Sequence, residues 1–423
     1  MIDRSIVPQI QPVDNLVLPM PRRYELDNQI PVYEINMGNQ QVIKLELIFK
    51  AGRWHEKEKL VARACSQLLR TGTLKHNAHE MAHFFEYYGA SLGIYDGFNT
   101  SNIQLYCLSK HLERLLPMLQ ELLTEPAFAQ DELQKFVTLN QQNLKVQLQK
   151  NDLVAYRVFT ESIYGSSHPY GYNSTEATYD SLDRSNLVEH FNNCYKSNHC
   201  NIIISGKTPA NCRQLLNRFF GQLEQGQLPD LDYPLMPPVE RQVLHQVLDP
   251  SSLQASIRIG RRLFNRAHPD CHQFYMTNMI LGGYFGARLM QNLREKNGYT
   301  YGAYASIETL MHSGYWYVHT DVGKDVAELA IQEIYTEIER LQDRPVHQDE
   351  LDIVKNYTMG MQLTSIDGVF NVSSLLKSLI TAQLDEQFFY EFIDTIKNIE
   401  PSHIQAMAQK YLDPNKLTEV VVL

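Results

Sequence analysis

The residues Ile43-Lys44-Leu45-Glu46-Leu47-Ile48-Phe49 begin with alternating apolar and polar side chains and lead into Ala51-Gly52-Arg53. Alternation of this kind predicts a β-strand. A second run, Ala255-Ser256-Ile257-Arg258-Ile259, alternates in the same way and meets Gly260-Arg261, 208 positions after the first glycine. This repeated strand-and-glycine pattern is the first indication that the chain contains two related halves.

Two further landmarks repeat in the same order. The tetrapeptide Gln130-Asp131-Glu132-Leu133 recurs 218 positions later as Gln348-Asp349-Glu350-Leu351, each time at the start of a helix-like segment. Late in each half a helical pattern ends at a tyrosine, Tyr195 or Tyr411, 216 positions apart, and a β-branched strand follows. Three landmarks at nearly constant spacing indicate an internal duplication.

The two halves meet at a proline-rich segment. Four prolines lie between Gly226 and Val239 among few helix-forming residues, which predicts an extended linker. We therefore expect an N-terminal domain over residues 1–225, a linker over 226–240 and a homologous C-terminal domain over 241–423. Within each half the strands come first and long helices follow. This order predicts an α+β fold, in which helices pack on one face of a mainly antiparallel sheet.

Composition excludes several classes of function. The chain carries 38 basic and 48 acidic residues, so its net charge of -10 argues against a nucleic-acid partner. No run of about eighteen apolar residues predicts a membrane span, and Met1-Ile2-Asp3-Arg4 is not followed by the apolar stretch of a secretory signal. The six cysteines include no C-x-x-C pair, which favours reduced, mostly buried thiols in a cytoplasmic protein.

Several segments resemble one family of zinc peptidases, which includes pitrilysin, insulysin and the mitochondrial processing peptidase. The most specific is Leu281-Gly282-Gly283-Tyr284-Phe285-Gly286-Ala287-Arg288-Leu289 leading to Leu293-Arg294-Glu295-Lys296-Asn297-Gly298-Tyr299-Thr300-Tyr301. It is similar to the glycine loop and the R-E-x-x-G-x-x-Y segment of the family's second half. Further similar segments follow the family's order over nearly the whole chain: Ala51-Gly52-Arg53, Thr71-Gly72-Thr73, His168-Pro169-Tyr170-Gly171 and Tyr195 to Gly206. The resemblance implies two homologous domains that form half of a clam-like chamber.

The family's metal-binding sequence is absent from the matching register. Family peptidases carry H-x-x-E-H, whose histidines hold zinc while the glutamate activates the bound water. The corresponding residues here are Arg63, Ser66 and Gln67, and the third ligand position falls at Gln142 or Asn143. Arginine has no lone pair to donate, serine is not basic near neutral pH, and amides are poor zinc ligands. We therefore expect a degenerate metal site, and a chain without a metal or other cofactor.

The sequence also contains the pattern of a different zinc-binding motif. His79-Glu80-Met81-Ala82-His83 reads as H-E-x-x-H, so an active zinc peptidase that uses His79, Glu80 and His83 is one alternative. No third ligand follows at a suitable spacing. Met81, Phe84, Phe85 and Tyr88 supply the apolar stripe of this helix and leave the histidines on its polar side. We favour a solvated helix face.

The resemblance assigns a substrate-binding role to Arg294 and Tyr301. In the family, these two positions of R-E-x-x-G-x-x-Y hold the substrate carbonyl beside zinc, and in some bacterial members one chain holds zinc while another supplies this pair. The resemblance implies a non-catalytic subunit that binds a peptide or small protein and assembles with a zinc-bearing homologous partner. Peptide would add to the edge of a sheet, and the strand leading to Ala51-Gly52-Arg53 is the candidate strand. An autonomous peptide-binding or assembly protein is the second alternative. If the two residues have only a structural role, we expect Arg294 to pair with Glu295 or a neighbour and Tyr301 to be packed in the protein.

Overall fold

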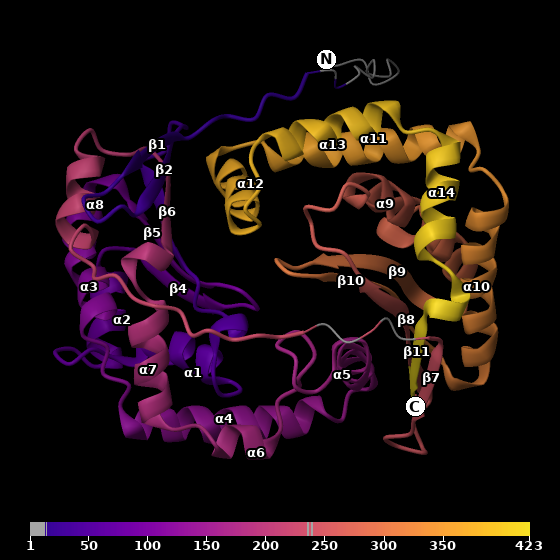
Figure 1. The fold of residues 1–423 in the computed structure, drawn as a ribbon, viewed down its shortest axis with the longest axis horizontal. Coiled ribbons are helices and arrows are strands. Elements are labelled where there is room, and N and C mark those ends of the chain that lie inside the picture. Colours follow the sequence, from indigo (N-terminus) through magenta and orange to yellow (C-terminus); the bar gives the residue numbers. More distant parts are fainter. Residues whose placement is uncertain (1–12, 14, 235–236, 238–239) are drawn as a thin grey trace, which may run out of the picture.

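The computed structural model describes residue 13 and residues 15–234, 237 and 240–423. The start of the chain, on which the expectation about a secretory signal rests, lies outside these residues, as does part of the predicted linker. Figure 1 shows two sheets in opposite halves of a ring-like arrangement, with the N-terminal elements in indigo and magenta and the C-terminal elements in orange and yellow. Between residues 226 and 234 the chain forms neither helix nor strand. The domain boundaries themselves stay a prediction.

The first sheet has six strands in the order β1-β2-β6-β3-β5-β4. Only β2 and β6 pair in parallel, and the other neighbours are antiparallel. The alternating run from Ile43 to Phe49 lies in β3, an interior strand of the sheet between β5 and β6. The strands are β1 (Arg22–Glu25), β2 (Pro31–Asn36), β3 (Val42–Phe49), β4 (Ser91–Asp96), β5 (Ser101–Leu108) and β6 (Cys200–Gly206).

The second sheet repeats this arrangement, and among the described residues it has no strand equivalent to β1. Its order is β7-β11-β8-β10-β9, and only β7 and β11 pair in parallel. The predicted α+β duplication with mainly antiparallel sheets is therefore confirmed. One landmark needs correction, because Gly260 and Arg261 lie inside β8 and do not follow it. The strands are β7 (Gln242–Gln246), β8 (Gln254–Leu263), β9 (Thr300–Thr309), β10 (Gly314–Gly323) and β11 (Thr418–Val422).

Helices of corresponding type follow the strands in both halves. Helices α4 and α11 begin at Gln130 and Gln348, as the repeated tetrapeptide predicts. The first half contains α1 (Val61–Leu68), α2 (Ala78–Tyr87), α3 (Leu112–Thr124), α4 (Gln130–Gln147), α5 (Asn151–Tyr164), α6 (Glu176–Asp180), α7 (Arg184–Cys194) and α8 (Cys212–Phe220). The second contains α9 (Cys271–Asn278), α10 (Ala327–Asp343), α11 (Gln348–Ser365), α12 (Val369–Thr381), α13 (Gln387–Asn398) and α14 (Pro401–Tyr411). The 3-10 segments η1 (Arg53–His55) and η2 (Leu69–Thr71) and the π-helical segment η6 (Met290–Lys296) border the sites described below.

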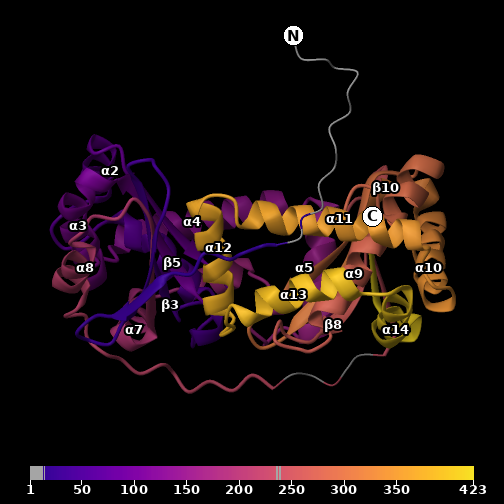
Figure 2. The ribbon, with the colours of Figure 1, turned by 90° about the horizontal axis from the view of Figure 1, so that it is seen from above.

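The two halves exchange one helix each. Helix α5 of the first half covers β8 and β11 of the second sheet, where Phe159 contacts Tyr317 with ring centroids 5.8 Å apart. Helix α12 of the second half packs on β6 and β2 of the first sheet. Each sheet therefore has its own helices on one face and a helix from the other half on the opposite face, an exchange that the sequence did not predict. Figures 1 and 2 show α12 beside the first sheet, on the side toward the second half, and α5 beside β8 of the second sheet.

A buried ion cluster joins α12 to the first sheet. The Glu46 carboxylate of β3 lies 2.8 Å from the Lys44 ammonium and 2.8 Å from that of Lys377 on α12. Its oxygens also accept hydrogen bonds from Asn102 and Ser373. Burial by itself would raise the pKa of Glu46, but the two lysines outweigh it and the pKa lies below its ordinary value. The cluster is an ionic contact between the halves within an otherwise apolar interface.

Two expectations from composition can be compared with the structure. Five of the six cysteines are buried and Cys271 is partly buried, and all six are free thiols. Within the described residues, no helix is both long and apolar enough to cross a membrane.

Candidate functional site

A buried carboxyl group anchors the start of α1, the helix that resembles the family's metal helix. One Glu56 oxygen accepts a hydrogen bond from the backbone N–H of Ala62 at 3.0 Å, and the other accepts one from the Tyr172 hydroxyl. The Tyr172 oxygen in turn accepts the backbone N–H of Leu60 at 3.1 Å. Burial raises the pKa of Glu56 to about 7, although these hydrogen bonds and nearby Arg53 oppose the shift. The carboxyl group thus fixes the entry of the chain into α1.

The three residues in the register of H-x-x-E-H have different environments. Arg63 is exposed, and Gln67, one turn later, donates a hydrogen bond to Asp96 at 3.1 Å. Ser66 is fully buried, and its hydroxyl lies 2.9 Å from those of both Ser101 and Tyr195. The Tyr195 hydroxyl also donates to Ser101 at 2.8 Å, so the three hydroxyl groups form a closed triangle. The Ser66 hydroxyl is therefore enclosed by protein groups and shielded from solvent.

The residues at these positions do not fit a zinc ion. Gln142 and Asn143, at the position of the third ligand, are exposed on α4. The set offers a guanidinium group, a buried hydroxyl and side-chain amides, but no imidazole, thiolate or carboxylate. In the part of the chain that the structure describes, no group of three or more His, Cys, Asp or Glu side chains is arranged to hold a metal. We derive no chemistry through a metal at this site.

A pocket of about 200 Å³ lies beside the start of α1. The Arg53 guanidinium is fixed on one wall, because it donates to the carbonyl oxygens of Pro169 and Tyr172 and lies 4.2 Å from the centre of the Tyr172 ring. Arg63, by contrast, has no hydrogen-bond, ion-pair or ring partner among the described residues. The pocket is lined by Arg53, Glu56, Ala62, Arg63, Asp96, Gly97, Phe98 and Tyr172.

The free edge of the first sheet ends at this pocket. Strand β4 pairs with β5 on one side, and its other edge has no strand partner among the described residues. Its last residue, Asp96, lines the pocket, and Tyr95 is 55% exposed. The expectation that the strand before Ala51-Gly52-Arg53 binds peptide is wrong, because β3 bonds to β5 and β6 along both edges. The candidate edge for an added strand is β4.

The H-E-x-x-H sequence lies on the exposed face of α2. His79 and His83 are exposed, with parallel rings whose centroids are 6.5 Å apart. Glu80 is engaged in the N-terminal cap of the helix, where it accepts from the backbone of Asn77 at 2.9 Å while the Asn77 side chain accepts from the backbone of Glu80. Met81 and Phe85 provide the buried side. This arrangement is that of an ordinary capped surface helix.

Arg294 and Tyr301 lie together in the second half. Arg294 belongs to η6, and its guanidinium carbon lies 4.8 Å from the centres of both the Tyr301 and the Phe285 rings. It also forms an ion pair with Glu295 at 3.4 Å, as the structural reading expected. Tyr301 is not packed in the protein, as a structural role would require, because its side chain is 88% exposed at the start of β9. Strand β9 is the outer strand of the second sheet.

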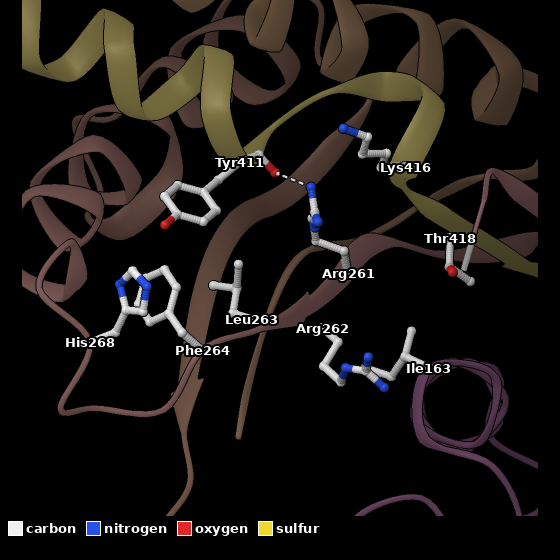
Figure 3. A pocket seen from close by; sticks show the side chains of 9 residues that line it. All are labelled: Ile163, Arg261, Arg262, Leu263, Phe264, His268, Tyr411, Lys416 and Thr418. Carbon is white, nitrogen blue, oxygen red and sulfur yellow. Dashed lines mark hydrogen bonds between the residues drawn. The ribbon is translucent and has the colours of Figure 1, made fainter. Parts of the chain in front are cut away.

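A second pocket, of about 280 Å³, lies near the end of β8 (Figure 3). Arg261 and Arg262 project to opposite sides of the strand, and Arg261 donates to the carbonyl oxygen of Tyr411 at 3.3 Å. His268 stacks on Phe264 with ring centroids 4.3 Å apart. The sequence pattern does not indicate this pocket, since His268 and Lys416 come from segments separate from Arg261 and Arg262. It contains neither the Arg63 group nor the Arg294 pair.

Comparisons with known proteins agree with this architecture. The profile described as "Insulinase (Peptidase family M16)" matches residues 32–167, and that described as "Peptidase M16 inactive domain" matches residues 181–358. An "Uncharacterized zinc protease" of Rickettsia bellii is 22% identical over 407 residues, which cover 94% of this chain and 90% of that protein. The "Non-peptidase homolog YmxG" of Helicobacter pylori is 22% identical over 390 residues, 89% of this chain and 88% of that protein.

The fold is shared with a solved structure. The crystal structure of a peptidase M16 inactive domain from Pseudomonas fluorescens superposes with a TM-score of 0.85 at 21% sequence identity, over 95% of this chain and 98% of that one. The two-domain, clam-like α+β architecture is thus the one expected from the resemblance. The chain belongs to peptidase family M16, as a member that lacks the family's H-x-x-E-H metal site.

Proposed function

We propose that this chain is a non-catalytic, peptide-binding subunit that assembles with a zinc-bearing homologue and supplies Arg294 and Tyr301 to the partner's active site. The observation that carries the proposal is the exposure of Tyr301. A tyrosine that is 88% exposed on an outer strand, beside an arginine 4.8 Å away, contributes little to the core of its own chain. Both side chains can donate hydrogen bonds to a carbonyl oxygen that gains negative charge during hydrolysis.

The free edge of β4 supports the peptide-binding part of the proposal. An extended peptide that pairs with an edge strand gains main-chain hydrogen bonds, which tolerate many sequences. The edge is short and ends among polar side chains, which limits self-association of the free chain. Zinc would come from the partner, since Arg63, Ser66 and Gln67 offer no ligand set. A cytoplasmic location, predicted from the cysteines, belongs to the same proposal.

The test is co-expression with candidate partners. Homologues of similar length that carry H-x-x-E-H would be produced with and without this chain, and peptidase activity measured for each chain alone and for the complex. We expect this chain to be inactive alone. In the complex, Tyr301→Phe should lower the rate about a hundred- to a thousandfold, the usual effect of removing one donor to an oxyanion. Arg294→Ala should have a similar effect.

Controls separate catalysis from assembly. Tyr301→Phe removes only a hydroxyl group, and Tyr304→Phe changes a second exposed tyrosine of the same strand in the same way. Both variants should form the complex normally by size-exclusion chromatography, and only the first should lose activity. If Tyr301→Phe and Arg294→Ala assemble and keep full activity, the proposed role of the pair is wrong. The chain would then be a peptide-binding or assembly protein.

A further inference from the structure

Arg63 lines the pocket at the start of α1 and has no partner among the described residues. Three cations near the start of α1 are engaged: Lys57 forms an ion pair with Glu189 at 2.5 Å, Lys59 donates to the carbonyl oxygen of Ser166 at 2.9 Å, and Arg53 donates to two carbonyls. The Arg63 guanidinium contacts no acid, carbonyl oxygen or aromatic ring in the described part of the chain. Since the protein has ten more acidic than basic residues, an unpaired guanidinium is not explained by a shortage of acids.

The two acids that line the same pocket have hydrogen-bond partners of their own. Asp96 accepts the amide of Gln67. Glu56 accepts the Ala62 N–H and the Tyr172 hydroxyl, and its pKa of about 7 leaves it partly protonated near neutral pH. The opposite wall carries the fixed guanidinium of Arg53. The pocket therefore presents one free cation and one fixed cation, beside Glu56, both of whose oxygens accept hydrogen bonds, and Asp96, one of whose oxygens does.

The position of the pocket connects it to the edge of β4. Asp96 ends that strand, and Gly97 and Phe98 continue directly into the pocket wall. Successive side chains of an added strand point alternately to the two faces of the sheet. A peptide paired with β4 would thus direct alternate side chains, or its own C-terminus, toward α1. A guanidinium group binds a carboxylate there with two parallel hydrogen bonds.

We infer that Arg63 and the pocket at the start of α1 bind a carboxylate group of the peptide held on β4, either an acidic side chain or the C-terminal carboxylate. The inference rests on the proposed peptide binding at β4 and names the class of peptide selected there. It gives a function to the residue that stands where catalytic relatives hold a metal ligand. The Arg63 guanidinium binds an anionic group of the peptide, and no bond is broken.

Three pools of fluorescein-labelled nonapeptides test the inference by fluorescence anisotropy with the full chain. The degenerate positions contain only Ala, Ser, Thr, Val and Asn. The first pool has a central Glu and an amidated end, the second a central Gln and an amidated end, and the third a central Gln and a free C-terminal carboxylate. We expect the first or third pool to bind about tenfold more tightly than the second, as for a charged hydrogen bond at a partly exposed site. Which of the two binds tightly identifies the source of the carboxylate.

Variants of two arginines provide the matched comparison. Arg63→Gln should remove the preference and leave the affinity for the uncharged pool unchanged, while Arg63→Lys should keep part of it. Arg70→Gln alters another exposed arginine, in η2 outside the pocket, and should keep the preference in full. The preference should also decrease as salt is added.

The outcomes separate this inference from the proposed function. Equal binding of all three pools by the wild-type chain overturns the carboxylate site and leaves peptide binding intact, as does a preference that persists in Arg63→Gln. If no pool binds, peptide binding at β4 fails and the carboxylate site fails with it.

Discussion

Replacing Glu46 by glutamine should destabilise the whole chain, because Glu46 is the centre of the buried ion cluster between the halves. The substitution keeps the shape of the side chain and removes its charge. Glu46 is fully buried, and it compensates Lys44, which is 2% exposed, and Lys377, whose side chain is 30% exposed. Glutamine would leave the Lys44 ammonium buried without a counter-ion.

The expected size of the effect follows from these exposures. Removing one partner of a buried ion pair costs about 3–5 kcal/mol, because the remaining charge stays uncompensated. Lys377 is better solvated, so its loss of a partner adds less than about 1 kcal/mol. Domains are stable by about 5–15 kcal/mol, and Glu46→Gln should therefore remove a large part of the free energy of unfolding.

Urea denaturation followed by circular dichroism and tryptophan fluorescence measures this difference. Agreement of the two probes shows whether a single transition describes the unfolding of both halves. Lys377→Gln should cost only about 1 kcal/mol. Lys44→Met combined with Glu46→Gln should be more stable than Glu46→Gln alone, because it removes the stranded charge. A Glu46→Gln variant within about 0.5 kcal/mol of the wild type would refute this reasoning.

Three further predictions concern metal, pH and proteolysis. Elemental analysis after mild chelation should find far less than one zinc per chain, and one tightly held zinc that is lost in His83→Ala would contradict the assignment of α2 as a surface helix. Burial lowers the pKa of His190 and of His168 from 6.5 to about 4. The unfolded chain therefore takes up protons first, and the melting temperature should fall as pH decreases from 6.5 toward 4. A pH slope that is unchanged in His190→Gln would argue against His190 as a cause. Limited proteolysis should cut first between Gly226 and Val239 into two fragments. The exchanged helices α5 and α12 should hold these fragments together in size-exclusion chromatography, and their separate elution would count against that contact.

Local features of the fold could be predicted from the sequence. The tetrapeptides at Gln130 and Gln348 start helices as expected, and Tyr195 and Tyr411 mark the ends of α7 and α14. These features depend on residues that are neighbours in the chain. The repeat of strand order follows from the duplication, since two homologous segments fold alike.

Features that depend on pairing between distant segments could not be predicted. The pattern of β3 indicates a strand but does not say which strands flank it. Because β5 and β6 pair with both edges of β3, a peptide cannot add to it as predicted. Likewise, Ser66 appears in the sequence only as a substituted position, and its burial depends on Ser101 and Tyr195, which are far away in the chain. Glu56 lies in a run of charged residues that is typical of a solvated loop, yet Tyr172 and α1 enclose it.

Helices α5 and α12 are both exchanged between the halves, but they differ in when they are synthesised relative to the strands that they cover. When α12 is synthesised, the strands of the first sheet that it covers already exist, whereas α5 precedes both strands that it covers. Strand β11 follows α5 by roughly 250 residues, which at synthesis rates of about 5–20 residues per second corresponds to roughly 13–50 s. Strand β8 is made earlier in this interval, but until β11 follows, the sheet beneath the apolar face of α5, with Val154, Phe159 and Ile163, is incomplete. The hydrophobic surface of α5 is thus fully covered only when the last strand is made, and until then it is a possible substrate for chaperones.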